Sequence, residues 1–365
     1  MTPLKIGFVL LSNSRNPIPS TRIAVLNMFP FLRAANFDPQ IVFDPVEPSE
    51  TPSLPELAQT IAEQGFRIIV FQKVYGPSVV ALARELGKRG VNTVYVVCDL
   101  VMPEMVEVTD ATVVVTGFLG SLYPAALQTK IHTVHDGIEH PEIFKTDWGK
   151  HRGSRSQPLR AVLVTSTNLD ELPHLGVPPD WLQVTVVGRY ASRSDRLNRL
   201  REIRWGLAKK RTLRERFDYI KFWSSSRIRC EAWDPVGVYE QMMHADIAII
   251  PIKTEPAFNP GKLPPPGWIV KSENRLTMKM SIGLPVIATP ISSYLPVINQ
   301  GVNGFLAQSP REWRSLLDQL RDPDLRGAMG AKARASVLER YSMQEQARRL
   351  ICVLDEFRQP AVAPR

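Results

Sequence analysis

Short apolar runs alternate with amphipathic stretches along the first 140 residues. The run over residues 6–11 is almost continuously apolar, which is typical of a strand buried on both faces. Ser20 or Thr21 can cap the helix expected after it. Further strands are expected at five similar apolar runs: 40–43, 67–72, 92–98, 111–116 and 130–134. Alternation of this kind predicts an α/β domain with a doubly wound parallel sheet.

The pattern breaks over residues 142–157, which are polar, basic and without periodicity. We interpret this segment as a linker between an N-terminal domain over 1–145 and a C-terminal domain over 158–342, with a helix and tail over 343–365. The second domain repeats the alternation, with strands expected at 159–165, 182–187, 227–232, 247–252 and 285–288, and helices at 195–217, 236–244 and 271–282. Two such domains are expected to face each other across a ligand-binding cleft.

A proline-rich segment interrupts the second series. Residues 255–268, EPAFNPGKLPPPGW, contain five prolines, which disfavour both helix interiors and central strands. Long loops inside a compact domain are usually functional. The segment is therefore expected to be a mobile element beside the cleft, with a plain surface insertion as the alternative.

Composition is that of a folded globular chain, and charge is its unusual feature. Of the 365 residues, 44% are hydrophobic, and 45 Lys and Arg face 36 Asp and Glu, giving a net charge of +9. This excess favours anionic partners. The cysteines Cys98, Cys230 and Cys352 are too widely separated to indicate a disulfide framework or a thiolate metal site. The apolar run at 6–11 is too short for a signal peptide or a membrane span, so a cytoplasmic protein is expected.

The positive charge is concentrated in one segment. Residues 193–229 contain thirteen Arg and Lys against four Asp and Glu, so this segment alone carries +9. Its leucines and isoleucine recur at helical spacing among the cations. The segment could be an amphipathic surface for peripheral contact with acidic lipid, a site for another polyanion or protein partner, or an ordinary solvated helix. No motif of an RNA- or DNA-binding protein accompanies it, which disfavours nucleic acid.

Residues 271–342 carry a resemblance to a known family. KSENRLTMKMSIGLPVIATP, GVNGFL, RDPDLR and ERYS resemble the C-terminal half of GT-B glycosyltransferases, particularly the retaining family 4. ADIAIIPI at 245–252 resembles the preceding strand of that family, and TDATVVVTGFLGSLYP and KIHTVHDGIE resemble its N-terminal half. The resemblance implies two Rossmann-like domains and transfer of a sugar from a nucleotide-diphosphate donor to an acceptor, without an essential metal or other cofactor.

The resemblance places the donor site at the start of the helix before GLPVIAT. Lys271, Ser272, Asn274 and Arg275 lie there, and cations and hydrogen-bonding groups at a positive helix end suit a diphosphate. The alternative is helix capping with solvated charge.

Two departures from the family pattern concern the same site. Val270 and Met278 stand where the family commonly has two glutamates, the second of which usually holds the ribose. After the strand at 159–165, hydroxyls of Thr165 and Ser166 replace the usual cations. Arg189, after the next strand, is a candidate replacement cation; the alternatives are an ordinary turn and a surface charge.

The N-terminal domain offers candidates for the acceptor side. Ser20, Thr21 and Arg22 could bind an acceptor or a phosphate, or simply form a helix cap with an exposed arginine. His135 is expected to border the cleft.

Asp99, at the end of the fourth strand, is the candidate catalytic residue: it could stabilise an oxocarbenium-like centre or orient the acceptor hydroxyl. The alternative is that Asp99 caps a short helix over 102–108. A histidine metal site is disfavoured, because the odd spacing of His132 and His135 along a strand puts them on opposite faces.

The sequence therefore favours a glycosyltransferase that uses a nucleotide-sugar donor and acts in surface-glycan or glycoconjugate synthesis. Two alternatives stay open: a catalytically silent glycosyltransferase-like binding subunit, which the missing glutamates favour, and a sugar-nucleotide epimerase on the same scaffold. The base, the sugar, the acceptor and the stereochemical outcome, retaining or inverting, are not specified by the residues.

Overall fold

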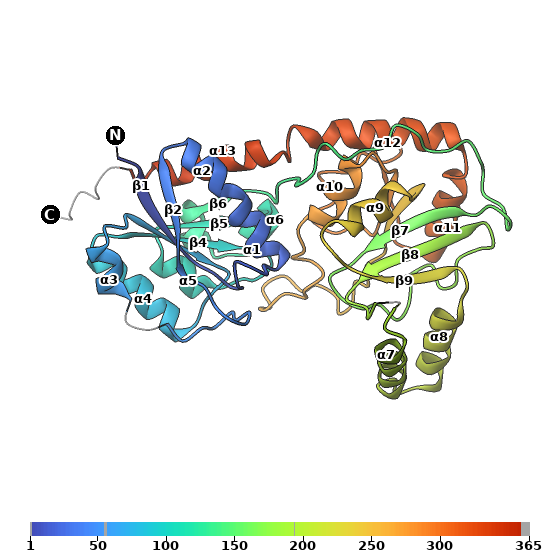
Figure 1. Ribbon diagram of the computed structural model, residues 1–365, viewed down its shortest axis with the longest axis horizontal. Helices are drawn as coiled ribbons and strands as arrows, with labels where there is room; N and C mark the ends of the chain where they lie inside the picture. Colours follow the sequence, from blue (N-terminus) through green and yellow to red (C-terminus); the bar gives the residue numbers. More distant parts are fainter. Residues whose placement is uncertain (1, 55–56, 193, 359–365) are drawn as a thin grey trace. The chain divides into compact units, whose positions relative to one another are not determined.

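The computed structural model describes residues 2–54, 57–192 and 194–358 (Figure 1). They form two compact units. Unit 1 comprises the described residues of Met1–Glu139, Glu255–Ser272 and Tyr341–Arg365, and unit 2 comprises those of His140–Thr254 and Glu273–Arg340. Each unit contains one six-stranded sheet of parallel strands, as the alternating pattern predicts.

The sheet of unit 1 has the strand order β2-β1-β3-β4-β5-β6. Its parallel strands are β1 (Leu4–Val9), β2 (Phe37–Phe43), β3 (Ile68–Gln72), β4 (Asn92–Val97), β5 (Ala111–Val114) and β6 (Ile131–Thr133). Successive residues of β3 face opposite sides of the sheet: Ile69 and Phe71 pack in one apolar cluster, and Ile68 and Val70 in another. Both faces of β3 are buried, which explains why this strand is almost continuously apolar rather than alternating.

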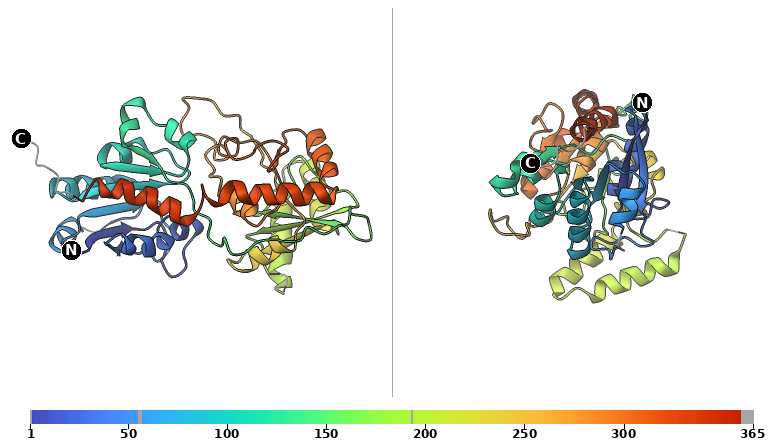
Figure 2. Two further views of the ribbon diagram at one scale, coloured as in Figure 1. Left: turned by 90° about the horizontal axis from the view of Figure 1, so that it is seen from above. Right: turned by 90° about the vertical axis from the view of Figure 1, so that its left-hand side faces the viewer.

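Helices cover both faces of this sheet (Figures 1 and 2). One face packs against α3 (Ala58–Glu63), α4 (Pro77–Lys88), α5 (Pro103–Val108) and α6 (Gly117–Ser121). The other packs against α1 (Pro19–Ala24), η1 (Leu26–Met28), α2 (Phe29–Ala34) and the C-terminal helix α13 (Met343–Asp355). A short 3-10 helix, η2 (Ala125–Lys130), precedes β6.

The proline-rich segment belongs to unit 1, although the residues before Glu255 and after Ser272 belong to unit 2. Ile269 and Val270 are buried in the apolar cluster of α3–α6, and Phe258 packs edge-on against Phe118. The Trp268 indole donates a hydrogen bond of 2.9 Å to the Pro256 carbonyl. The segment has no helix or strand, as expected from its prolines, but apolar side chains anchor both of its ends.

Unit 2 repeats the architecture with the strand order β12-β11-β10-β7-β8-β9. Its strands are β7 (Leu159–Val164), β8 (Leu182–Gly188), β9 (Ile228–Ala232), β10 (Ile247–Ile250), β11 (Val286–Ala288) and β12 (Phe305–Leu306). Its helices are α7 (Arg196–Ala208), α8 (Leu213–Ser224), α9 (Gly237–Met243), α10 (Asn274–Ser281), α11 (Pro310–Gln319) and α12 (Pro323–Leu338). Among the described residues, no helix combines the length and the apolar character needed to cross a membrane.

The single helix expected over 195–217 is two helices. α7 ends at Ala208, and α8 begins at a capping box in which Thr212 accepts from the Glu215 backbone N–H and the Glu215 carboxylate accepts from the Thr212 N–H. The sequence T-x-x-E already contains this start signal. The expected single helix was therefore wrong at this point.

The polar segment over 142–157 is fastened to unit 2. Lys145 is buried and donates to the Met243 carbonyl at 2.6 Å, and the Trp148 indole donates to the Gly283 carbonyl at 2.6 Å. The fully buried Arg326 guanidinium donates to the His151 carbonyl at 2.7 Å. The polar segment thus exchanges hydrogen bonds with unit 2 in both directions, and the boundary between the units falls at 139–140.

Candidate functional site

Charged side chains gather where the strands of unit 1 end. Lys73 directly follows β3, Asp99 lies two residues after β4, and Asp136 lies three residues after β6. Because the carboxyl ends of parallel strands share one edge of the sheet, these residues lie in the region where α/β folds bind ligands. Lys271 and Ser272 reach the same edge from the end of the proline-rich segment.

Asp99 lies between two lysines. The Lys73 ammonium is 2.9 Å from Asp99 Oδ1, and the Lys271 ammonium is 3.7 Å from Asp99 Oδ2. Lys73 also contacts Glu50 at 3.2 Å and is only 13% exposed. The alternative role of Asp99 as a helix cap is not what the structure shows: α5 has Met102 at its N-cap and no side-chain cap hydrogen bond.

The lysines keep Asp99 ionised. Burial opposes ionisation of the carboxyl, but the charge and hydrogen bond of Lys73 and the charge of Lys271 outweigh it, so the pKa of Asp99 lies below its ordinary value. Burial alone would lower the pKa of Lys73, yet Cys98, Asp99 and Glu50 together raise it well above the ordinary value. An anionic Asp99 can accept a proton or stabilise positive charge, and it cannot serve as a proton donor at neutral pH.

Ser272 extends this cluster to the end of β6. Its hydroxyl donates a hydrogen bond of 2.7 Å to Asp136 Oδ2, and Asp136 is 8% exposed. Next to Asp99, burial followed by the Asp99 charge raises the pKa of the Cys98 thiol well above its ordinary value, so Cys98 is a neutral neighbour. The edge therefore presents two carboxylates, Asp99 and Asp136, that are held by side chains of the 271–272 segment.

Sequence reasoning missed Lys73, Glu50 and Asp136. Lys73 has a backbone φ of 56°, a left-handed conformation that is uncommon for a residue with a side chain, and its N–H donates to the Val96 carbonyl at 2.8 Å. The available signal was positional: Lys73 directly follows the apolar strand IIVFQ, just as Asp99 follows VVC. Glu50 and Asp136 carry no such signal that separates them from surface acids.

The candidates of the first loop have structural partners. α1 begins at Pro19 with Ile18 as its N-cap, so neither Ser20 nor Thr21 caps it, and that expectation was wrong. The Thr21 hydroxyl is buried and donates to Gln72 Oε1 at 2.9 Å, while the Ser12 hydroxyl donates to Thr21 Oγ1 at 2.8 Å. Ser20 is half-buried. Thr21 therefore joins the loop to the end of β3, next to Lys73.

Arg22 and His135 are also engaged. The Arg22 guanidinium makes a two-pronged ion pair with Glu139, at 2.7 and 2.9 Å. His135 Nδ1 donates to the Val115 carbonyl at 2.9 Å, and its ring lies edge-on to Tyr341 with centroids 5.0 Å apart. Both residues lie at the same edge of the unit 1 sheet, after β1 and β6, and their ligand roles stay predictions.

In unit 2 the structure brings Thr165, Ser166 and Arg189 together. Thr165 follows β7, and Arg189 follows β8, its neighbour in the sheet. Thr165 Oγ1 accepts from the Thr167 N–H at 3.2 Å, whereas Ser166 and Arg189 are exposed. Gly188 permits this approach, because a Cβ built there would lie 2.8 Å from the Thr167 carbonyl oxygen.

The other donor-site candidates divide between the two units. α10 begins at Asn274, so Asn274 and Arg275 occupy its first turn, while Lys271 and Ser272 precede it and belong to unit 1. α10 connects the parallel strands β10 and β11, so its N-terminus lies at the carboxyl edge of the unit 2 sheet, as do Thr165 and Arg189. Gly283, with φ of +86°, ends the helix in the joint SIGLP. The expected helix start at Lys271 was therefore wrong by three residues.

The two positions without the family's glutamates have different surroundings. Val270 is 2% exposed in the apolar core of unit 1, where a carboxylate would be costly. Met278 lies half-buried in α10. In the parts of the chain that the structure describes, no three His, Cys, Asp or Glu side chains are grouped so as to hold a metal ion.

No protein-family model matches this sequence, and its comparison with curated proteins gives no match. Solved structures do match in fold. A glycosyltransferase of Rickettsia africae is 12% identical over 98% of this chain and 99% of its own, with a TM-score of 0.67. HepE of Anabaena, solved with UDP, is 13% identical over 97% of this chain and 100% of its own, with a TM-score of 0.61.

Sucrose-phosphate synthase of Thermosynechococcus elongatus gives a TM-score of 0.62 at 13% identity, over 97% of this chain and 98% of its own. HepE was also solved with UDP-glucose. In these alignments the likeness covers both Rossmann-like units and not one alone. The chain therefore has the two-domain α/β fold of GT-B glycosyltransferases.

Proposed function

We propose that this protein is a glycosyltransferase that moves a sugar from a nucleotide-diphosphate donor to an acceptor. The observation that carries the proposal is the end-to-end likeness to HepE, a protein solved with UDP and with UDP-glucose. The charged groups at the carboxyl edges of both sheets supply matching chemistry. Family 4 membership, a retaining outcome and a role in surface-glycan synthesis belong to the proposal as well.

The donor diphosphate is assigned to unit 2. Asn274 and Arg275 stand in the first turn of α10, where the helix dipole favours an anion, and Ser166 and Arg189 are exposed at the same edge of the sheet. These groups can bind a diphosphate without a metal. With a valine and a methionine at the two family glutamate positions, the ribose must be held by other groups.

The reacting sugar and the acceptor are assigned to unit 1. Asp99 is anionic between Lys73 and Lys271, so its carboxylate suits stabilisation of an oxocarbenium-like centre or acceptance of a proton from the acceptor hydroxyl. The Lys271 ammonium, 3.7 Å from Asp99 Oδ2, helps to keep this carboxylate ionised.

A thermal-shift panel with UDP, GDP, ADP, dTDP and CMP tests the proposal. We expect one nucleotide to raise the melting temperature at concentrations above its dissociation constant. Arg275→Gln should reduce the shift, whereas Arg314→Gln, an exposed arginine on α11 of the same unit, should leave it intact. A folded protein that responds to none of the five would contradict a donor site.

A catalytically silent binding subunit remains the second candidate, favoured by Met278 and by Val270. Release of free nucleotide from the matching nucleotide-sugar separates the two. An enzyme should release nucleotide and lose this activity in Asp99→Asn, while a silent subunit should show a thermal shift and no release in either form.

A further inference from the structure

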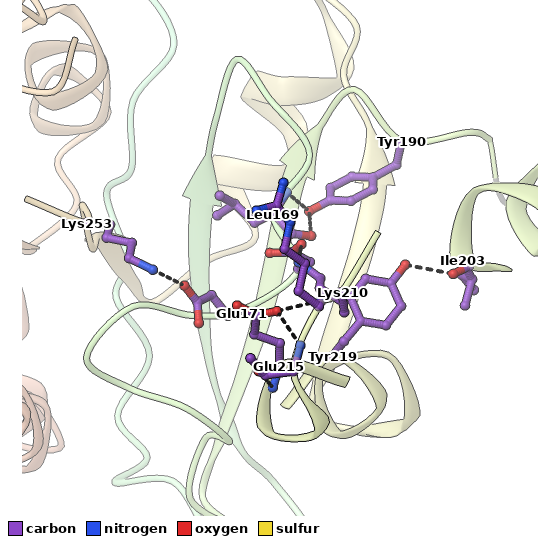
Figure 3. A network of polar contacts seen from close by, with 11 residues as sticks. Leu169, Glu171, Tyr190, Ile203, Lys210, Glu215, Tyr219 and Lys253 are labelled. Atoms are coloured by element: carbon purple, nitrogen blue, oxygen red, sulfur yellow. Dashed lines mark hydrogen bonds and ion pairs between the residues drawn. The ribbon is translucent and has the colours of Figure 1, made fainter. Parts of the chain in front are cut away.

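The helices α7 and α8 form a hairpin on unit 2, which we call the α7–α8 hairpin, residues 195–224 (Figures 1 and 2). Its inner side is attached to the unit. Phe222 is buried in the apolar core of unit 2. Tyr219 is also buried, and its hydroxyl joins the two helices by donating to the Ile203 carbonyl of α7 at 3.1 Å (Figure 3). Lys210 pairs with Asp170. One side of the hairpin therefore packs on unit 2, and its other side faces solvent.

The outer side of α8 is apolar although it faces solvent. Leu213, Phe217 and Ile220 recur at i, i+4 and i+7, which places them on one stripe, and they are 83%, 58% and 51% exposed. The buried Tyr219 and Phe222 lie on the opposite face of the same helix. A cluster of large, solvent-exposed apolar side chains indicates a surface that binds a partner.

α7 also exposes large apolar side chains. Leu197, Leu200 and Trp205 are 71%, 63% and 68% exposed, and none of the thirteen residues of α7 is buried. Of the fourteen large hydrophobic side chains exposed among the described residues, six belong to these two helices. The exposure is therefore concentrated in the hairpin rather than spread over the unit.

Cations surround the apolar side chains. Arg196, Arg201, Arg204 and Arg211 are exposed, and among the described residues none of these four side chains pairs with a carboxylate. The Lys209 ammonium lies 3.4 Å from the centroid of the Trp205 ring, and the Lys221 ammonium lies 4.2 Å from that of Phe217. These cations lie next to the apolar side chains. A partner of this surface must therefore offer both anionic and apolar groups.

We propose that the α7–α8 hairpin docks on the surface of an anionic lipid bilayer. The apolar side chains would enter the boundary between headgroups and acyl chains, and the arginines and lysines would contact lipid phosphates. A nucleic acid would neutralise the cations but leave Leu213, Phe217 and Ile220 in water. Charge complementarity together with the apolar stripe therefore selects a membrane.

Sedimentation of the full-length protein with vesicles tests the proposal without nucleotide, so its outcome is independent of the donor site. We expect binding to phosphatidylcholine vesicles containing about 30% phosphatidylglycerol to exceed binding to pure phosphatidylcholine by at least about 10-fold at roughly 0.1 M salt. Equal binding to both vesicles, or binding to neither, would overturn it.

Two sets of substitutions divide the apolar and charged contributions. Leu213→Ser with Phe217→Ser should weaken binding to anionic vesicles by about 10-fold or more, and should leave little binding at high salt. Arg201→Gln with Arg204→Gln should weaken binding by about 10-fold and reduce its salt dependence. Unchanged vesicle affinity in either double variant would contradict the proposal.

Matched controls lie elsewhere on unit 2. Leu295 is 57% exposed, and Arg311 and Arg314 are exposed on α11, so Leu295→Ser and Arg311→Gln with Arg314→Gln should leave binding unchanged. Because all of these side chains are exposed, the variants should have the same melting temperature as the wild type. As a second measurement, an aqueous quencher is added to the wild type and to Trp205→Phe. The difference between the two proteins is the fluorescence of Trp205, and this fluorescence should be protected from the quencher when anionic vesicles are present. Two results would overturn the proposal. One is that the Trp205 fluorescence is quenched as strongly on anionic vesicles as in solution, and the other is that the hairpin binds RNA or a protein and not the vesicles.

Discussion

Lys73 Nζ lies 2.9 Å from Asp99 Oδ1, and the two residues follow neighbouring strands at the same edge of the unit 1 sheet. Lys271, 172 residues further along the chain than Asp99, approaches the other carboxylate oxygen at 3.7 Å. A partly buried carboxylate between two cations stays ionised. Under the proposed function, this charged cluster is the one assigned to the reacting sugar.

Asp99→Asn should reduce sugar transfer by about 100-fold or more, because the amide can neither accept a proton nor stabilise positive charge as a carboxylate does. Nucleotide binding, assigned to unit 2, should persist in the thermal-shift assay. Glu47→Gln, an exposed carboxylate in the same unit, serves as the control and should leave the rate unchanged. A transfer rate of Asp99→Asn equal to that of the wild type would remove Asp99 from the reaction.

Lys73→Met should move the acid limb of the pH–rate profile to higher pH. Burial raises the pKa of Asp99 while Lys73 and then Lys271 lower it, so the net pKa lies below the ordinary 3.8 and Asp99 stays ionised down to acidic pH. Without Lys73 the pKa of Asp99 should rise. The profile of Lys88→Met, an exposed lysine of α4, should match the wild type.

Loss of Lys73 should shift the pH dependence of folding stability in the same direction as the acid limb, to higher pH. A carboxyl with a depressed pKa stabilises the folded state above its unfolded-state pKa, and this contribution is lost as the pH falls through the lower folded-state value. Lys73→Met should therefore make the melting temperature fall at a higher pH than in the wild type. An acid limb and a melting curve that both stay in place would show that Lys73 does not set the ionisation of Asp99.

The fold could be predicted because its signal is local. Strands such as IIVFQ in β3 and ATVV in β5 are apolar on both faces, and only a sheet covered on both sides buries them. Boundaries that depend on distant partners could not be predicted. Residues 142–157 read as a free linker because nothing in their composition reveals that Arg326, more than 160 residues away, donates to their carbonyls.

The candidate site could be predicted only in part, for the same reason. Asp99 and Lys271 were each identified separately, but their pairing joins two segments of unit 1 that residues 140–254 of unit 2 separate in sequence. Val270 aligned with a family glutamate, yet it packs in the core of unit 1. The surroundings of such a residue follow from the chain's return to unit 1, which no local pattern encodes.

Gly188→Ala should weaken nucleotide binding by displacing the loop after β7. The added Cβ would lie 2.8 Å from the Thr167 carbonyl oxygen and 3.0 Å from the Thr165 methyl group, and backbone cannot yield as a flexible side chain can. Overpacking of this kind costs about 1–3 kcal/mol. Gly87→Ala, in α4 with open space around its Cβ, should instead be neutral or slightly stabilising. Equal nucleotide shifts in the two variants would show that this loop is not part of the donor site.

Lys279→Met should stabilise the protein at neutral pH. Lys279 is fully buried in α10, where it donates to the Arg275 carbonyl at 2.9 Å, and burial followed by the Arg275 charge lowers the pKa of its amine well below the ordinary 10.5. Between the pKa of Lys279 in the folded protein and its higher pKa in the unfolded protein, unfolding takes up a proton. The free energy of unfolding of the wild type should therefore rise with pH in that window.

Methionine at position 279 fills a similar volume without a buried amine. Lys279→Met should raise the free energy of unfolding by about 1–3 kcal/mol near pH 7 and remove this contribution to the pH dependence. Urea titrations at pH 7 and pH 9 measure both effects, with Lys332→Met on the exposed face of α12 as the control. A less stable Lys279→Met at both pH values would show that the hydrogen bond to Arg275 outweighs the cost of burying the amine.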